Sequence, residues 1–122
     1  KGAINVHASL LPKYRGAAPI NWAIIRGESE TGVSIITLAD RMDAGDILAQ
    51  CATPIGVHET AGELHDRLAQ LSAPLLLETL EQLEAGTASY TKQDELEATK
   101  APKLKKSDGF LDFADPAYVL AD

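Results

Sequence analysis

An amide, an imidazole and a carboxylate are spaced in this chain so that they could share one reaction centre. Asn5 and His7 stand two residues apart at the end of a short apolar run, and Asp43 follows His7 by 36 residues. Alternate residues of a strand point to the same face, so Asn5 and His7 would project together from a strand end. Ligands of α/β proteins usually bind at strand ends. This placement favours an enzyme.

These three residue types suit the transfer of an acyl-type group to an amine. The amide of Asn5 and a protonated His7 can stabilise the oxyanion that forms when an amine attacks a carbonyl carbon. Histidine also gives and takes protons near neutral pH. The opposite charge of Asp43 would favour the protonated imidazole. Such a reaction needs no serine or cysteine nucleophile.

Each of the three residues also has a purely structural interpretation. His7 could be a buried histidine whose nitrogens are satisfied by the fold, and Asn5 could be an amide that pairs only with backbone groups. Asp43 lies in Met42-Asp43-Ala44-Gly45-Asp46, and Asp and Gly favour turns. The residue types alone leave both interpretations open.

The composition limits the class of protein. The chain has 122 residues, enough for one small domain, and is 45% hydrophobic but only 5% aromatic, which predicts an aliphatic core. The net charge of −7 argues against a free-standing nucleic-acid binder. Cys51 is the only cysteine, so a reducing cytoplasm is the simplest setting. No apolar run is long enough to span a bilayer, and His58 and His65 lack companions for a metal site.

The pattern of apolar and turn-forming residues predicts an α/β fold. We expect a buried strand at 3–6, a helix at 20–26, strands at 33–38 and 47–53 joined as an antiparallel hairpin, a short strand at 88–90 and an extended segment at 93–113. The ends predict an internal fragment, because Lys1 leads directly into a strand without an initiator Met and residues 115–122 resemble a helix that is only beginning.

The longest helical signal runs from Thr60 to Ala85. Its leucines recur at helical spacing, and Thr60 followed by Glu63 matches a capping box. Gly86 should end the helix. Pro74 removes a backbone hydrogen bond, so a kink or a break into two helices is expected there. The leucine stripe is interpreted as core.

The segment Asn5-Val6-His7-Ala8-Ser9-Leu10-Leu11-Pro12, with Asp43 at its distance, resembles the folate-dependent formyltransferase family. The likeness extends over residues 1 to about 113 and is greatest for the branch that formylates methionyl-tRNA. It implies a Rossmann-like catalytic domain (three-layer α/β/α), with residues 1–88 as its C-terminal half. Residues 89–122 would be a linker leading to a further domain. The basic surface expected of a tRNA-binding enzyme would lie in that domain.

The same resemblance implies roles for particular residues. His7 would be the general acid/base, Asn5 the oxyanion donor and Asp43 the group that tunes His7. The donor 10-formyltetrahydrofolate would contact one loop and lie with its pterin along one turn, and no metal would be needed. The loop residues are Ser9, Leu10, Leu11 and Pro12, and those of the turn are Leu38, Ala39, Asp40, Arg41 and Met42. Lys13 and Arg15 are exposed by pattern and flank the site, so they either belong to a solvated loop or contact phosphates of the tRNA acceptor stem.

Two other functions remain open at this point. Enzymes that formylate a UDP-amino sugar share the Asn, His and Asp and a similar tail. A non-catalytic α/β module would instead use the leucine helix to bind a partner. The methionyl-tRNA interpretation predicts initiator methionyl-tRNA as the substrate of the full-length protein. That protein would be a monomeric cytoplasmic enzyme without a membrane partner. A basic cluster at Lys100, Lys103, Lys105 and Lys106 could follow a nucleic-acid backbone.

Overall fold

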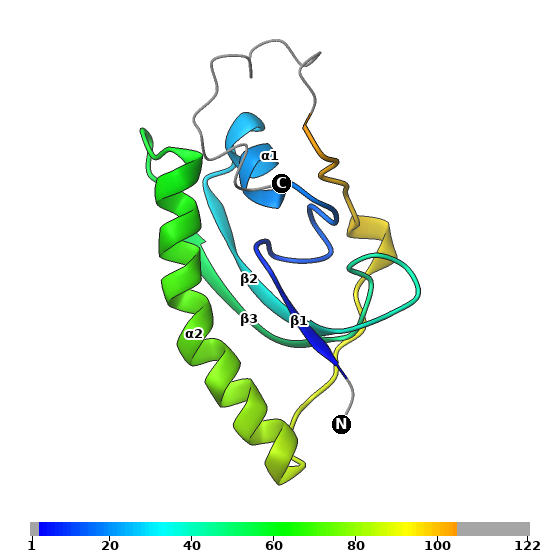
Figure 1. Ribbon diagram of the computed structural model, residues 1–122. Coiled ribbons are helices and arrows are strands. Elements are labelled where there is room, and N and C mark those ends of the chain that lie inside the picture. Colours follow the sequence, from blue (N-terminus) through cyan, green and yellow to red (C-terminus); the bar gives the residue numbers. More distant parts are fainter. Residues whose placement is uncertain (1–2, 105–122) are drawn as a thin grey trace.

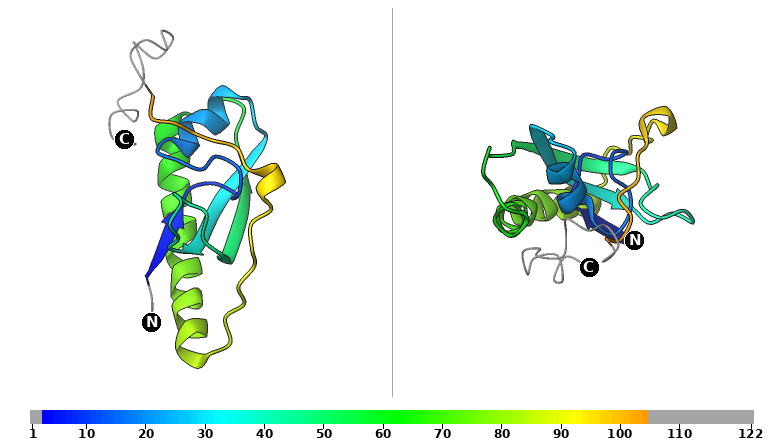
Figure 2. Two further views of the ribbon diagram at one scale, coloured as in Figure 1. Left: turned by 90° about the vertical axis from the view of Figure 1, so that its right-hand side faces the viewer. Right: turned by 90° about the horizontal axis from the view of Figure 1, so that it is seen from above.

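The computed structural model describes residues 3–104, which form one antiparallel sheet packed against helices (Figure 1). The sheet order is β1-β2-β3, and both neighbouring pairs are antiparallel. A long helix, α2, lies across one face of the sheet and extends beyond it (Figures 1 and 2). In chain order the elements are β1 (Ile4–His7), α1 (Pro19–Ile25), β2 (Glu30–Thr37), β3 (Ile47–Pro54), α2 (Ala61–Ala85) and the 3-10 helix η1 (Glu95–Glu97).

Strands β2 and β3 form the hairpin that the sequence predicts. Thr37 closes the loop between them at both ends: its backbone N–H donates to the Asp46 carbonyl at 3.0 Å, and its hydroxyl accepts from the Asp46 N–H at 3.0 Å. The register shifts between Ile35 and Ile36, close to this loop. Such an irregularity bends a strand and changes the direction of the chain beyond it. The 38–46 loop that carries Asp43 is therefore anchored at its base.

The core is aliphatic, as the composition predicts. Ile20 of α1, Val33 of β2, and Leu64 and Leu68 of α2 are all buried in one cluster. This cluster joins both helices to the central strand. It holds the sheet rigidly behind the loops that follow β1 and β2.

Helix α2 has the ends that its sequence predicts. The Glu63 N–H donates to the Thr60 hydroxyl at 3.1 Å, and the Thr60 N–H donates to the Glu63 carboxylate at 3.0 Å, which completes a capping box. Gly86 ends the helix in the left-handed conformation, with φ of 76°. The predicted break at Pro74 is wrong, because one helix runs from Ala61 to Ala85. The leucines on both sides of Pro74 pack against the same core, which holds the helix together.

Two strand predictions need correction. The first strand spans Ile4–His7 and is not buried as expected: Asn5 and Val6 are exposed, since β1 pairs with β2 alone in the described part of the chain. Residues 88–90 are not a strand. Instead, Thr91 forms an isolated bridge with Ile47, with N–H to carbonyl distances of 2.9 and 2.7 Å.

The trailing segment, residues 91–102, packs on the loop that follows β1. The Arg15 N–H donates to the Thr99 carbonyl at 2.9 Å, and the Ala101 N–H donates to the Arg15 carbonyl at 2.7 Å. The Ala18 N–H donates to the Ala101 carbonyl at 3.0 Å. In Figure 2 this yellow-to-orange segment runs beside the blue loop. Residues far apart in sequence are thus joined around the β1 end.

Some predictions lie outside the described residues: Lys105 and Lys106 of the basic cluster, the end of the extended segment, and the helix expected to begin at 115. Within residues 3–104, no helix is both long enough and apolar enough to cross a membrane.

Candidate active site

His7 ends β1 and is buried, with its side chain 7% exposed. Its Nε2 lies 2.8 Å from the Tyr14 carbonyl oxygen. A carbonyl only accepts hydrogen bonds, so Nε2 carries a proton. In the neutral ring Nδ1 is then the unprotonated nitrogen. The fold therefore orients the imidazole and leaves Nδ1 as the atom that can take a further proton.

Asp43 lies against that second nitrogen. Its Oδ2 is 3.6 Å from His7 Nδ1, and its side chain is 9% exposed. The same oxygen accepts a 2.8 Å hydrogen bond from the Gly16 N–H. The 3.6 Å separation is longer than a hydrogen bond but within ion-pair range, and catalytic contacts are often loose before a substrate binds. A proton on Nδ1 would face the carboxylate.

The backbone at Asp43 is unusual. Its φ of 57° lies in the left-handed region, where Asp and Asn are the commonest non-glycine residues. This conformation turns the chain so that the carboxylate of the 38–46 loop reaches the end of β1. Sequence spacing predicted a His–Asp contact, and the structure brings these two residues together.

Asn5 lies on β1 two residues before His7 and is exposed. By strand alternation it shares a face with His7, as predicted. Its role as oxyanion donor stays a prediction.

The predicted folate loop is divided between buried and accessible residues. Ser9 is fully buried and its hydroxyl donates to the Lys13 carbonyl at 2.6 Å. Leu11 is also buried, and its N–H donates to the Ser34 hydroxyl at 3.0 Å. Leu10 and Pro12 are half-buried and line a cavity of about 410 Å³. Leu11 also lines this cavity, but Leu10 and Pro12 are the more exposed pair. The hydrogen bonds of Ser9 and Leu11 fix the loop.

The predicted pterin turn is open to solvent. Leu38 is 61% exposed and Met42 is 71% exposed, with Ala39, Asp40 and Arg41 exposed between them. Two large exposed apolar side chains on one short turn leave apolar surface available to a flat ligand.

Lys13 is exposed, as predicted, but Arg15 is not: its side chain is 12% exposed. The Arg15 guanidinium donates to the Glu95 carboxylate at 2.8 and 3.0 Å and to Gln93 Oε1 at 2.8 and 3.1 Å. The prediction that Arg15 is exposed was wrong. It was made from local pattern, whereas the acid that binds Arg15 lies 80 residues further along the chain.

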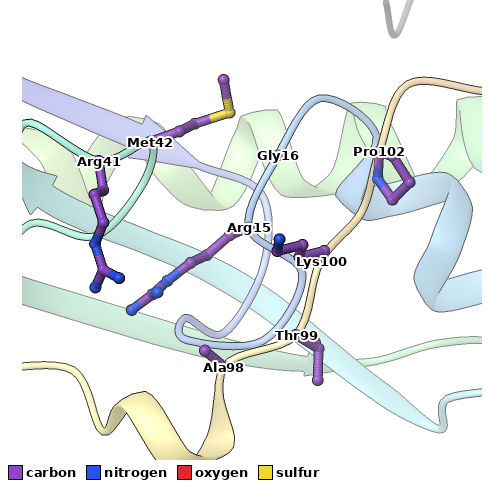
Figure 3. Close-up of a pocket in the computed structure, with 8 residues that line it drawn as sticks. All are labelled: Arg15, Gly16, Arg41, Met42, Ala98, Thr99, Lys100 and Pro102. Carbon is purple, nitrogen blue, oxygen red and sulfur yellow. The ribbon is translucent and has the colours of Figure 1, made fainter.

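Glu95 binds a second arginine as well. Arg41 of the predicted pterin turn lies 2.8 Å from Glu95, and Figure 3 shows the side chains of Arg15 and Arg41 converging. Hydrogen bonds from Arg15 and then Arg41 lower the pKa of Glu95 to about 2. Glu95 therefore stays ionised at working pH and bridges the two loops.

A cavity of about 400 Å³ opens beside this bridge, next to the Asp43 loop (Figure 3). Its wall is formed by the loop after β1, the 38–46 loop and the trailing segment. The lining residues are Arg15, Gly16, Arg41, Met42, Ala98, Thr99, Lys100 and Pro102. Two of them, Arg41 and Lys100, are exposed cations. Gly16, whose N–H donates to Asp43 Oδ2, connects this cavity to the His7–Asp43 pair.

Tyr14 connects His7 to Glu28. Its carbonyl accepts from His7, and its hydroxyl donates to Glu28. Burial, reinforced by that acidic partner, raises the pKa of Tyr14 to about 12. Arg26 stacks over the rings of Tyr14 and Trp22, with its guanidinium carbon 5.5 and 5.4 Å from the ring centroids. The phenol is therefore neutral and structural at working pH.

Sequence reasoning missed Tyr14, Gly16, Gln93 and Glu95 as neighbours of the site. Gln93 and Glu95 lie in a polar stretch typical of a surface linker, and no spacing relates them to His7 or Asp43. Metal binding was not predicted. Within residues 3–104, no three His, Cys, Asp or Glu side chains are grouped as metal ligands.

Comparisons with known proteins place the chain among the formyltransferases. The formyl transferase family profile matches residues 1–80, and the chain belongs to that family. The chain is similar to the methionyl-tRNA formyltransferase of Solibacter usitatus, with 55% identity, and to that of Citrifermentans bemidjiense, with 50% identity. Each alignment covers 98% of this chain, which spans 38% and 37% of the length of those two relatives.

Solved structures confirm the expected Rossmann-like α/β fold. The formyltransferase PseJ of Anoxybacillus kamchatkensis, in complex with a UDP-linked formamido sugar and tetrahydrofolate, has a TM-score of 0.80 and 26% identity. The likeness covers 95% of this chain and 60% of that one. HypX of Aquifex aeolicus with tetrahydrofolic acid has a TM-score of 0.77 and 26% identity, over 85% of this chain and 18% of that one. Residues 3–104 contain part of the sheet and helices of this fold: three strands with α1 and α2 packed against them, and no third layer of helices.

Proposed function

We propose that the full-length protein containing this chain transfers a formyl group from 10-formyltetrahydrofolate to the α-amine of methionyl-tRNA. The observation that carries the proposal is the buried His7–Asp43 pair, 3.6 Å apart, with the other ring nitrogen held by Tyr14. The names of relatives with 50–55% identity support this acceptor. The folate bound in structural neighbours supports this donor.

In the proposed reaction the amine attacks the formyl carbon, forming a carbon–nitrogen bond and placing negative charge on the carbonyl oxygen. The Asn5 amide and protonated His7 stabilise that oxyanion. The bond from carbon to the folate nitrogen then breaks, and the proton lost by the amine goes to that leaving nitrogen. The Asp43 carboxylate faces His7 Nδ1, where it can pair with the charged imidazole. General acid/base groups of this kind commonly contribute about 10²–10⁴-fold.

The described residues fit a folate donor. The exposed turn 38–42 offers backbone groups and the apolar side chains of Leu38 and Met42 for a pterin ring. Leu10 and Pro12 line a separate cavity beside the start of β2, and hydrogen bonds of Ser9 and Leu11 hold that loop in place. Lys13 remains a candidate for contact with tRNA phosphate. Arg15 is not, because its guanidinium is bound within the protein.

The alternative acceptor is the amine of a nucleotide-linked sugar. One observation favours it: structural neighbours include sugar N-formyltransferases, such as a Helicobacter canadensis enzyme with a TM-score of 0.79. That enzyme is 26% identical to this chain, against 50–55% for the relatives named for methionyl-tRNA, so the tRNA acceptor is preferred. Family membership argues against the non-catalytic module. A cytoplasmic location, a monomeric state and residues 89–122 as an interdomain linker are part of the same proposal.

The test uses the full-length protein with 10-formyltetrahydrofolate and either methionyl-tRNA or a UDP-amino sugar. We expect formyl-methionyl-tRNA, and we expect His7→Ala to lower kcat by about 10²–10⁴-fold. His58→Ala is the matched control, because His58 is exposed in the loop before α2. Transfer to the sugar alone would replace the acceptor. Full activity of His7→Ala would overturn the mechanism.

A further inference from the structure

Gln93 is the residue through which the trailing segment contacts the Asp43 loop. Its Nε2 donates to the Asp43 carbonyl at 2.8 Å and to the Gly45 carbonyl at 2.7 Å. Both acceptors are backbone groups of the loop that brings the carboxylate to His7. A single side chain thus binds the loop on both sides of Ala44.

The same amide also binds the loop that follows β1. Gln93 Oε1 accepts from Arg15 Nε at 3.1 Å and from a terminal Arg15 nitrogen at 2.8 Å. Gly16, the next residue, donates its N–H to Asp43 Oδ2 at 2.8 Å. Gln93 therefore fixes the two loops that meet at the Asp43 carboxylate: one carries the carboxylate and the other carries its backbone donor.

The chemistry of this position requires a primary amide. An amide has two N–H donors and an oxygen that accepts two hydrogen bonds, and all four are used here. A carboxylate of the same shape could accept from Arg15 but could not donate to the two carbonyls. Asparagine has the right groups but is one methylene shorter.

We propose that Gln93 is a positioning residue for the formyl-transfer reaction, holding the 38–46 loop so that the Asp43 carboxylate faces His7. The proposal rests on the proposed function for its catalytic consequence. The left-handed backbone at Asp43 gives a physical reason for the clamp. A non-glycine residue in that region persists only where its surroundings hold it, and Gln93 binds the Asp43 carbonyl itself.

The kinetic test is Gln93→Glu in the full-length enzyme, with Gln70→Glu as the control. Gln70 is exposed on α2, so the control adds the same charge away from the site. We expect Gln93→Glu to lower kcat by about 10–100-fold, since misplacement of about 1 Å can cost about 10²-fold. The KM values for 10-formyltetrahydrofolate and methionyl-tRNA should change by less than about 3-fold. Activity equal to that of Gln70→Glu would overturn the proposal.

A double-mutant cycle shows whether Gln93 acts through Asp43. Asp43→Asn removes the charge but suits the left-handed backbone. In the Asp43→Asn background, Gln93→Glu should cost less than about 3-fold further in kcat, because coupled residues are not additive. A full 10–100-fold additional loss would mean that Gln93 acts independently of Asp43, which contradicts a positioning role.

A third measurement does not depend on the acceptor. The imidazole ¹⁵N shifts of His7 are recorded by NMR without substrate, in the wild-type protein, in Gln93→Glu and in Asp43→Asn. We expect Gln93→Glu to move the Nδ1 signal in the same direction as Asp43→Asn. An unchanged signal would overturn the proposal even in an active enzyme. If Gln93→Glu shifts the signal but the wild-type protein formylates neither acceptor, the positioning role of Gln93 would be upheld and the proposed function rejected.

Discussion

At the scale of single residues, Asp43 meets two requirements that substitutions can separate. It supplies a negative charge to His7, and it adopts a backbone φ of 57°. Asparagine tolerates that conformation and lacks the charge, whereas valine, which is β-branched, is strained there.

Asp43→Asn is therefore expected to fold with nearly unchanged stability and to lose at least about 10-fold in kcat. Asp43→Val should lose the same charge and also about 1–3 kcal/mol of unfolding free energy, the usual cost of an unfavourable backbone region. Urea unfolding and formyl-transfer kinetics on the two variants would check this. Equal stability of the two variants would show that the turn is not held in the left-handed conformation.

Tyr14 gives a prediction at alkaline pH. Its folded pKa, about 12, is above the usual value of 10, so the neutral phenol is stabilised by folding. That contribution is fully present below pH 10 and is lost as pH rises from 10 towards 12.

Wild-type protein should accordingly lose more stability between pH 9 and 11 than Tyr14→Phe does, measured by urea unfolding at each pH. Tyr90→Phe is the control, because Tyr90 is 57% exposed. If wild type and Tyr14→Phe lost stability in parallel, the buried hydrogen bond from Tyr14 to Glu28 would not be present in solution.

At the scale of elements, local signals predicted what local interactions determine. The capping box at Thr60 and Glu63 and the ending at Gly86 were predicted correctly, because neighbouring residues form those contacts. The hairpin β2–β3 was also correct, since a short loop joins its strands. Predictions failed where the partner is distant in sequence: Arg15 is buried by Glu95, and Thr91 pairs with Ile47. No periodicity or spacing encodes such contacts.

The base of the 38–46 loop is closely packed against β2. A Cβ at Gly45 would overlap the Thr37 carbonyl oxygen, which is backbone and cannot move aside. Gly45→Ala should therefore shift the loop and lower the unfolding free energy by about 1–3 kcal/mol, typical of overpacking. The shift should also reduce kcat, because Gly45 is two residues from Asp43.

Gly56→Ala is the matched control for Gly45→Ala. Its Cβ would meet only the Glu59 side chain, at 3.5 Å or more, and its φ is not in the left-handed region. We expect a change within about 0.5 kcal/mol, as for most surface substitutions. Thermal unfolding of the two variants measures the difference. Comparable stability would mean that the loop relaxes without cost.

At the scale of the whole molecule, the trailing segment joins the two loops that meet at the His7–Asp43 pair. Its backbone pairs with the loop after β1, and its side chains Gln93 and Glu95 bind both loops. The sequence suggested only an extended segment, because its polar composition is equally suited to a free linker. The approach of His7 and Asp43 could therefore be predicted from the sequence, but the contacts that hold the two residues there could not.

The ion pairs of Glu95 with Arg15 and Arg41 make the attachment of the trailing segment sensitive to acid and to salt. The folded pKa of Glu95 is depressed to about 2 from 4.5, so the bridge is intact above pH 4.5 and weakens as pH falls towards 2. The bridge is exposed, so salt should weaken it as well.

Backbone amide signals of Thr99 and Ala101, followed by NMR, should shift over this pH range in the wild-type protein. Glu95→Gln should abolish that titration, because an amide carries no charge and binds the two arginines weakly at every pH. Glu97→Gln, an exposed acid in the same 3-10 helix, should retain it. Equal titration in wild type and Glu95→Gln would show that another acid holds the trailing segment against the site.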